Sequence, residues 1–239
     1  NCKNIFTTLF YQPILNLLVW LHNFIPGNDF GWSIVALTVL IKIILWPLSG
    51  KSLKSQKALQ DLQPKVDALK TQYKDNKEAL GRAMMDLYKA EKVSPFSSCL
   101  PLLVQFPFLI AIYQVLNDGL QNGSLDKLYS FVARPEAVNM VFLGIFDLSK
   151  ASIILALVSG AFQFWQTKML IHKPQPAIPG AKDENMASMM NKQMLYVMPI
   201  LTVVIGATLP GGLVLYWLMN TIVTLIQQII VLKRHASTT

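Results

Sequence analysis

The sequence has few charged residues and few of the side chains that catalytic sites use. Only 14% of its 239 residues are charged, and it contains three histidines and two cysteines. It has no phosphate-binding glycine loop, no HExxH motif and no pair of carboxylates within an apolar run. The histidines fall in a predicted surface helix (His22), a loop (His172) and the tail (His235), so an intramembrane serine–histidine dyad is not expected. We predict a protein that is not an enzyme and uses no metal or cofactor.

What the sequence has instead is long apolar runs, with its charges clustered between them. Hydrophobic residues make up 53% of the chain. A hydrocarbon core about 30 Å thick is crossed by about 20 apolar residues in a helix. Five segments reach or approach that length: about 31–50, 95–117, 151–167, 193–209 and 212–232. We therefore predict an all-α, polytopic membrane protein with five transmembrane helices.

The first thirty residues predict a different kind of helix. Residues 5–25 are apolar but carry Gln12, Asn16 and Asn23 on one side, which favours an amphipathic helix lying in the membrane interface. Cys2 leaves open a lipid-modified N-terminus, although Asn is a poor residue to precede a lipid-modified cysteine. Because the chain begins with Asn, we expect it to be a processed product or a fragment.

The distribution of Lys and Arg predicts the orientation in the membrane. Segment 51–92 holds ten of them, and sixteen fall on its side of the membrane against four on the other side. This places the N-terminus outside and the C-terminus in the cytoplasm, so the net charge of +8 reflects topology first. Nucleic-acid binding is the weaker interpretation, except that ribosomal RNA could meet the cytoplasmic face. The predicted order is an interfacial segment (1–30), spans at 31–50, 94–117, 151–167, 193–209 and 210–232, a cytoplasmic hairpin (51–93), an outer loop (118–150), a cytoplasmic loop (168–192) and a cytoplasmic tail (233–239).

The basic segment 51–92 has an internal pattern of its own. Apolar residues recur at helical spacing in two stripes, over 53–73 and 80–88, and the polar string KDNKE at 74–78 separates them. Pro64 is well placed at the start of a helix. The pattern predicts an antiparallel helical hairpin that projects into the cytoplasm; the alternative is a solvated basic loop.

Lys42 lies within an apolar stretch, 32–50, that has no other charge, and no Asp or Glu occurs in any predicted span. A cation near mid-bilayer costs roughly 2.5–3.5 kcal/mol, so it normally faces water, a partner or a site. One explanation is snorkelling, because Lys42 is roughly 10 Å from the cytoplasmic end of its helix. Snorkelling and a cavity open to the cytoplasm are compatible.

Polar side chains also line up at helical spacing within four of the predicted spans. Interhelical hydrogen bonds of about 0.6–2 kcal/mol each explain any single stripe. Four stripes and a lone cation together favour a water-filled cavity among the helices. The stripes are Thr38 with Lys42; Ser98 with Gln105; Ser159, Gln163 and Gln166; and Trp217, Thr221, Thr224 and Gln228, with Tyr216 and Asn220 alongside.

Prolines interrupt three of the predicted spans and indicate irregular helices. Pro101 and Pro107 lie within the second span, Pro199 lies within the fourth, and Pro47 is predicted to end the first. Each removes one backbone hydrogen bond and bends or loosens its helix. Inside a membrane, the freed carbonyls need neighbours or water, which again favours a wet interior.

Four strings in the sequence carry a resemblance to a known family. LTVLIKIILWPL (37–48), LQPKVDALKTQYKD (62–75), LYKAEKVSPFSSCLPLLVQFP (87–107) and PGGLVLYWLMNTIVTLIQQ (210–228) resemble the YidC/Oxa-type membrane protein insertases. They occur in the order of the family and extend over almost the whole chain. The bacterial YidC branch is the most similar.

The resemblance implies a five-helix core with a groove that is open to the cytoplasm and to lipid. It places the family's basic groove residue at Lys42, with Thr38 one turn away, where it would attract acidic parts of a client. It places groove residues of the third span at Gln163 or Gln166. Substrate-contacting residues are implied at Cys99, Pro101, Gln105, Phe106 and Pro107 on the second span and at Tyr216 and Trp217 on the last, beside Asn220 and Thr224.

The resemblance also implies a function and its partners. It predicts insertion and folding of membrane proteins in the bacterial inner membrane without a nucleotide, with nascent chains, the ribosome, the signal-recognition pathway, the Sec translocon and lipid as partners. The sequence departs from the family pattern in having Lys instead of the usual Arg, and serines at 94, 97 and 98. A lysine can lose its proton when desolvated, so Lys42 requires a wet groove. The alternatives are a small transporter or channel subunit, which has no need of the hairpin, and an assembly scaffold.

Overall fold

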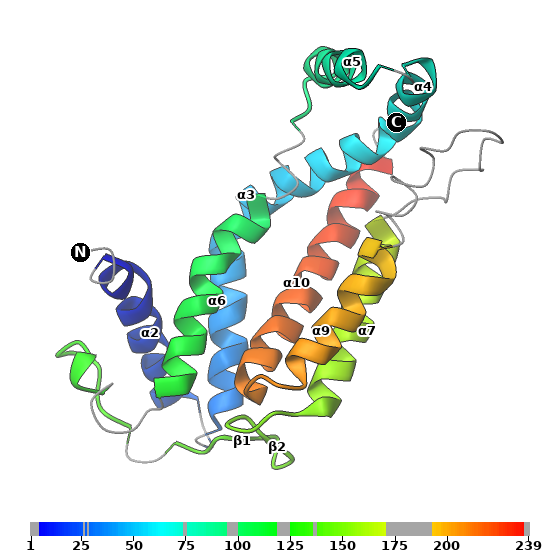
Figure 1. Cartoon of the computed structure of the whole chain (residues 1–239). Helices are drawn as coiled ribbons and strands as arrows, with labels where there is room; N and C mark the ends of the chain where they lie inside the picture. Colours follow the sequence, from blue (N-terminus) through cyan, green and yellow to red (C-terminus); the bar gives the residue numbers. More distant parts are fainter. Residues whose placement is uncertain are drawn as a thin grey trace.

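The computed structural model describes residues 5–25, 27, 29–73, 76–94, 100–118, 125–135, 138–170 and 193–236. Most of these residues are helical, as predicted (Figure 1). A bundle is formed by α3 (Phe30–Asp61), α6 (Leu100–Asp118), α7 (Ile153–Leu170), α9 (Met198–Gly206) and α10 (Gly211–Ala236).

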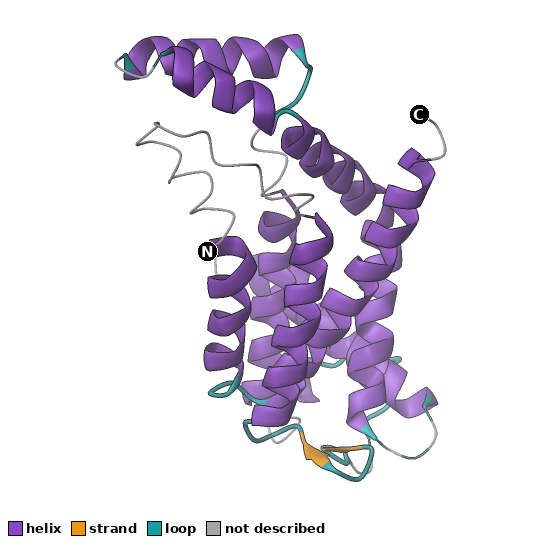
Figure 2. Ribbon diagram, turned by 90° about the vertical axis from the view of Figure 1, so that its right-hand side faces the viewer, coloured by secondary structure: helices purple, strands orange, loops and turns teal. Residues whose placement is uncertain are grey.

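Different elements mark the two ends of the bundle (Figure 2). Helices α4 (Gln63–Gln72) and α5 (Lys77–Ala90) extend beyond one end, which we call the α4–α5 end. The antiparallel strands β1 (Val141–Phe142) and β2 (Phe146–Asp147) lie at the opposite end, which we call the β1–β2 end.

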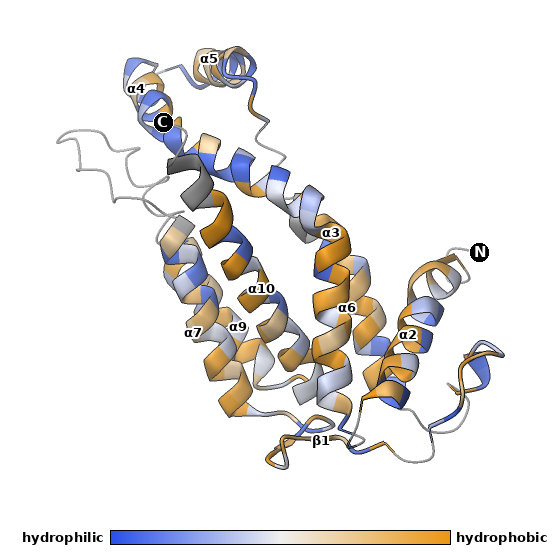
Figure 3. Cartoon of the chain, turned by 180° about the vertical axis from the view of Figure 1, so that it is seen from behind, coloured by the Kyte–Doolittle hydropathy of each residue, from blue (hydrophilic) through white to orange (hydrophobic). Residues whose placement is uncertain are grey.

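Two of the described helices are long and apolar enough to cross a bilayer by length and composition. They are α3 and the part of α10 from Gly211 to Val231. Leu103–Asp118 and Gln193–Gly206 are shorter apolar helices. The bundle helices are largely hydrophobic, whereas α4, α5 and the adjoining part of α3 are rich in hydrophilic residues (Figure 3).

Helix α3 differs from the prediction at Pro47. The proline was expected to end the first helix, but α3 continues through it to Asp61. The helix changes direction in this region (Figure 1), as expected where a proline removes a backbone hydrogen bond. The Gln227 side chain of α10 lies here, and its Nε2 donates to the Trp46 carbonyl oxygen at 2.8 Å. The first part of the segment assigned to the hairpin is therefore the continuation of the first helix.

Helices α4 and α5 contact each other beyond the bundle. Pro64 lies in the first turn of α4, where its missing N–H leaves no intrahelical hydrogen bond unmade. Asn76 caps α5 by accepting a hydrogen bond from the Ala79 amide at 3.0 Å. Pro64 and the Asn76 cap explain why the two helices begin where they do. Lys65 of α4 and Glu91, which directly follows α5, form an ion pair that joins the two helices.

Two other prolines that interrupt predicted spans also lie in helices. Pro107 is inside α6. Pro199 lies in the first turn of α9, directly after the π-helical turn η4 (Gln193–Val197). Because proline supplies no N–H to the preceding turn, a wider turn at this point is a reasonable consequence.

The hydrophobic core lies in the half of the bundle next to the β1–β2 end. On α3 the buried apolar residues are concentrated between Phe30 and Ile41, and on α6 they are Ala111, Ile112 and Val115. On α10 they run from Leu213 to Leu218, with Leu225 further along the helix. Buried residues nearer the α4–α5 end include Lys42, Ser52, Gln227 and Gln228. The interior thus changes from apolar to polar along the bundle.

Backbone hydrogen bonds close the β1–β2 end. The amide of Phe30, at the start of α3, donates to the Asn139 carbonyl oxygen at 3.0 Å. The amides of Gly211 and Gly212, at the start of α10, donate to the carbonyl oxygens of Lys150 and Leu148 at 2.8 and 2.9 Å. The segment before α7 therefore satisfies free N–H groups at the beginning of two bundle helices.

The N-terminal segment, which the sequence predicts to form an amphipathic helix in the interface, is helical and packs against the bundle. The π-helical turn η1 (Thr7–Tyr11) and α2 (Gln12–Phe24) pack against α3 and α6. Its polar residues bind the segment 125–135, and Asn23 among them is also exposed to solvent. Asn16 Nδ2 and Gln12 Nε2 donate to the Lys127 carbonyl oxygen at 3.2 and 3.1 Å, and Asn23 Nδ2 donates to that of Ala133 at 2.8 Å.

His22 is also not on the surface, contrary to the prediction. It is 3% exposed, and its Nδ1 lies 3.4 Å from the Oγ of Ser33, which is completely buried. A serine–histidine contact therefore exists. Because both side chains are enclosed, this contact offers no access to a substrate and we interpret it as a packing contact between α2 and α3.

Candidate functional site

Lys42 is held inside the bundle by neutral groups. Its side chain is 7% exposed, and its Nζ donates to the Thr224 hydroxyl of α10 at 2.9 Å. The Thr224 hydroxyl in turn donates to the Asn220 carbonyl oxygen at 2.7 Å. Among the described residues, none of the ion pairs includes Lys42. An ammonium group has three N–H donors, so this cation retains donors for a further partner.

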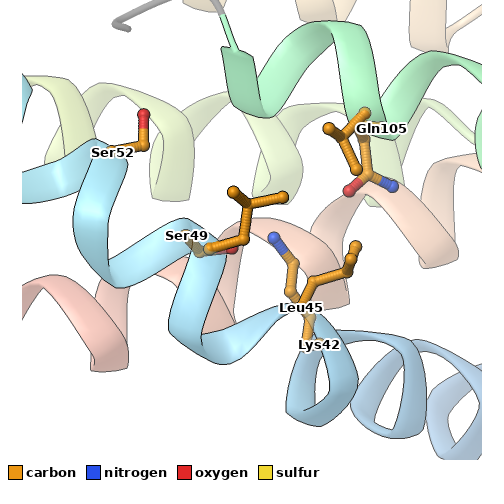
Figure 4. Close-up of a pocket in the computed structure, with 7 residues that line it drawn as sticks. Lys42, Leu45, Ser49, Ser52 and Gln105 are labelled. Carbon is orange, nitrogen blue, oxygen red and sulfur yellow. The ribbon is translucent and has the colours of Figure 1, made fainter.

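A small pocket lies beside this cation, between α3 and α6 (Figure 4). The Lys42 ammonium points toward the space between Ser49 and Gln105. The cavity volume is about 20 Å³, which admits a water molecule but not a peptide segment. The lining residues are Lys42, Leu45, Leu48, Ser49 and Ser52 of α3 and Val104 and Gln105 of α6.

Gln105 joins the pocket wall on α6 to the centre of the bundle. Its Nε2 donates a hydrogen bond to the Tyr216 hydroxyl of α10. Tyr216 is 1% exposed, so its hydroxyl depends on this internal partner. The structure thereby brings together four of the residues singled out in the sequence: Lys42, Gln105, Tyr216 and Thr224.

Three other predicted groove residues have different surroundings. Thr38 is buried, and its hydroxyl donates to the Ile34 carbonyl oxygen of its own helix at 2.7 Å. Gln163 of α7 accepts a hydrogen bond from the Thr202 hydroxyl of α9. The Gln166 carbonyl oxygen accepts one from Gln228 Nε2 at 3.3 Å. The contacts of Gln163 and Gln166 join α7 to α9 and to α10, and none of the three residues lines the pocket beside Lys42.

The predicted contact residues on α6 are only partly described. Phe106 is 52% exposed, on the same outer face as Leu103 and Ile110. Pro107 is half-buried within the helix, and Pro101 lies in its first turn. Cys99 lies outside the described residues. Trp217 of α10 is half-buried. Asn220 contributes its carbonyl to Thr224, and its side-chain oxygen is buried without a partner among the described residues.

Two polar residues that line the pocket were missed in the sequence. Ser49 and Ser52 follow Lys42 by seven and ten residues, so they share its face if the helix is continuous. The spacing was a usable signal. A helix that ends at Pro47, as the sequence predicts, would leave both serines outside it. Gln227 was missed for a related reason, since its partner is the bend that follows from that proline.

A metal site finds no support in the part of the chain that the structure describes. It contains no group of three or more His, Cys, Asp or Glu side chains placed to hold an ion. The chemistry of the pocket is instead that of a cation, amides and hydroxyls, which suits binding of an acidic or polar segment.

The chain is similar to known proteins in both sequence and structure. The family model of the 60Kd inner membrane protein matches residues 20–238. The membrane protein insertase YidC of Francisella tularensis subsp. novicida (strain U112) is 33% identical over 226 residues, as is that of Francisella tularensis subsp. tularensis (strain SCHU S4 / Schu 4). These matches cover 93% of this chain but 36% of each relative, so the chain spans about a third of their length.

A solved structure is similar over nearly the same range. The crystal structure of an active YidC insertase with its first transmembrane domain resolved matches with a TM-score of 0.60 and 26% identity. The match covers 92% of this chain and 45% of that one. The chain therefore belongs to the 60Kd inner membrane protein family, the YidC/Oxa-type family that its sequence resembles.

Proposed function

We propose that this protein is a membrane protein insertase of the bacterial inner membrane. A polar or acidic segment of a client enters beside Lys42, and the adjoining apolar segment then passes along α6 into lipid. The observation that carries the proposal is the buried Lys42 ammonium, which is bound by Thr224 and has no acidic partner among the described residues.

The attraction for an acidic client follows from simple electrostatics. Two opposite charges about 4 Å apart attract by about 4 kcal/mol at an effective dielectric constant of about 20. That interaction offsets part of the cost of moving a carboxylate out of water. Burial of the client's apolar segment, at about 25 cal/mol per Å², supplies the driving force without a nucleotide or a catalysed reaction.

The small size of the pocket makes movement of α6 part of the proposal. A volume of about 20 Å³ does not hold a peptide. Near the pocket, α6 is tied to α10 by the hydrogen bond from Gln105 to Tyr216. A client that supplied its own polar groups would replace this bond as α6 moved outward. The exposed Leu103, Phe106 and Ile110 would then offer an apolar path beside it.

The proposed topology has five spans, with the N-terminus outside and the C-terminus in the cytoplasm. It is supported by the excess of Lys and Arg in segment 51–92 and by the apolar surfaces of the bundle helices. Helices α4 and α5 would then form a cytoplasmic unit. We propose nascent membrane proteins, the ribosome, the signal-recognition pathway and the Sec translocon as partners, and no DNA.

Crosslinking of ribosome-bound nascent chains tests the proposal. A photo-crosslinking residue at Leu45, which lines the pocket, is compared with one at Ile44, which is 67% exposed on the outer face of the same helix. We expect an acidic-tailed client to crosslink from position 45 during insertion. Crosslinks from position 44 alone would favour an assembly scaffold. Crosslinks from neither, together with ion or solute flux in vesicles, would favour a transporter or channel subunit.

A further inference from the structure

The turn between β1 and β2 exposes two large apolar side chains. Leu143 is 54% exposed and Ile145 is 75% exposed, and the Gly144 between them adds no polar side chain. The turn lies at the β1–β2 end, where its apolar residues are visible beside β1 in Figure 3. Exposed apolar residues at the tip of a loop, where polar residues are usual, require an explanation.

The backbone of this turn is unfavourable for the residue that it carries. The Ile145 amide donates to the Phe142 carbonyl oxygen at 3.1 Å, and both central residues have positive φ, 54° at Leu143 and 71° at Gly144. Positive φ at both positions is the requirement of a type I′ turn, for which Asn-Gly is strongly preferred. Leucine at the first position is uncommon and strained. Neither folding nor solubility accounts for a leucine here.

The tip is nevertheless held firmly in place. The Leu143 amide donates to Asp29 Oδ2 at 2.9 Å, while Oδ1 of the same carboxylate caps α3 by accepting from the Gly31 amide at 2.8 Å. Phe142 covers Gly31 so closely that a Cβ at that position would overlap its ring. The turn is therefore fixed to the first turn of a helix long enough to cross a bilayer.

An aromatic residue beside the turn indicates the level of the membrane surface. Trp32 is 46% exposed in the first turn of α3, and its ring contacts that of Phe142 edge-on, with centroids 5.6 Å apart. Tryptophans at the ends of spanning helices are enriched at the membrane–water interface. The exposed Trp32 thus lies against the buried Phe142, which directly precedes the exposed tip residues.

We propose that Leu143 and Ile145 form a lipid-binding tip, which inserts into the interfacial layer of the leaflet at the β1–β2 end. Insertion places apolar side chains among headgroups and upper acyl chains and explains the leucine in a strained turn. It also anchors β1, and with it the start of α3, to the bilayer. The inference requires that α3 spans the bilayer but not that the protein inserts clients.

Depth measurements on the whole chain in lipid nanodiscs test this inference. Cys2 and Cys99 are replaced by serine, and a polarity-sensitive fluorophore is attached through Ile145→Cys. The control is Ser149→Cys, an exposed polar position in the same segment. We expect lipid spin-labelled near the headgroup to quench position 145 more than position 149, and aqueous iodide to do the reverse. Equal quenching of both positions by iodide would overturn the proposal.

A second variant separates lipid binding from folding. Leu143→Asn creates the Asn-Gly pair that suits this turn, so its melting temperature in detergent should be unchanged or higher. In nanodiscs, the same change should make the label at position 145 more accessible to iodide. A label that remained inaccessible would contradict the inference. A label shielded only in native membranes, and open to iodide in nanodiscs, would identify a protein partner instead of lipid and overturn it as well.

Discussion

The two ends of the bundle differ in what holds their helices together. At the β1–β2 end, apolar residues from α2, α3, α6, α7 and α10 fill the interior, and backbone hydrogen bonds join the loops to the helices. Toward the α4–α5 end, the interior contains Lys42, Gln105 and Thr224, with a pocket beside them. Apolar packing needs no specific partner, whereas each buried polar group needs one.

This difference teaches how one bundle can be firm and adaptable at once. When a client segment supplies an equivalent hydrogen-bonding partner, a buried polar group can exchange its internal partner for the new one at little cost in free energy. A close-packed apolar core has no such exchange available, and opening it creates a cavity. Under the proposed function, clients would therefore enter from the polar half while the apolar half keeps the membrane sealed.

The largest expected effect comes from reversing the charge in the polar half. Lys42→Glu should lower insertion of a client with an acidic segment by at least about tenfold. Loss of about 1.4 kcal/mol already gives that factor, and the full attraction is about 4 kcal/mol. In vitro insertion into vesicles measures it, with Lys42→Arg as the control that keeps the charge. Parental activity of Lys42→Glu toward such clients would remove the electrostatic part of the mechanism.

The second prediction compares one glycine from each half of α3. Gly31→Ala should lower the stability of the protein by about 1–3 kcal/mol, because its Cβ would overlap the Phe142 ring. Gly50→Ala meets only Gln227 Nε2, at 3.6 Å, and should be neutral or stabilise the helix by up to about 1 kcal/mol. Thermal unfolding in detergent measures both. Equal melting temperatures would show that the two halves are packed alike.

The third prediction isolates the contact between Thr224 and Lys42. Thr224→Val removes the oxygen that accepts from the ammonium, at a cost of about 1 kcal/mol. Insertion of acidic clients should fall several-fold, which is less than for Lys42→Glu. Thr221→Val is the matched control on the same helix, since the Thr221 hydroxyl donates to the Trp217 carbonyl oxygen of that helix. Equal losses in both variants would assign the effect to helix packing.

The smallest expected effect concerns acid at the β1–β2 end. Hydrogen bonds from the Ser149 side chain, the Lys150 ammonium and the Ser149 amide lower the pKa of Asp147 to about 2. A depressed folded-state pKa stabilises the fold above the unfolded value near 4, and this is lost as pH falls from about 4 to about 2. The protection of amides around Ser149 from hydrogen exchange, relative to the intrinsic rate at each pH, should therefore be constant down to about pH 4 and fall below it. In the Asp147→Asn variant this fall in protection should be absent.

The sequence was sufficient to predict the apolar helices and the central polar cluster. Spacing or the family resemblance indicates Lys42, Gln105, Tyr216 and Thr224, and hydrogen bonds link these four residues in two pairs. Long apolar runs and a lone cation are properties of the sequence itself, so they can be recognised without knowing how the helices pack.

Features that depend on which helices face each other were not predictable from spacing. Gln163 lies on a polar stripe, but its partner is Thr202, because α7 packs on α9. Asn16 belongs to a polar side that looks water-facing, but it is buried and bonds to the segment 125–135. Pro47 predicts the end of a helix, but α3 continues through it with a bend. Beside the bend, Gln227 of α10 donates to the Trp46 carbonyl oxygen, a tertiary contact that spacing does not reveal. Periodicity shows that a face is special but not what meets it.

The continuity of α3 through Pro47 has a mechanical consequence. One helix runs from the β1–β2 end past Lys42 and the pocket to Asp61, directly before α4. A force applied to α4 and α5 is therefore not absorbed by a slack connection. It is transmitted along α3, through the bend beside Gln227, to the part of the helix that carries Lys42. Binding of a partner to α4 and α5 would therefore act on the position of the Lys42 side chain.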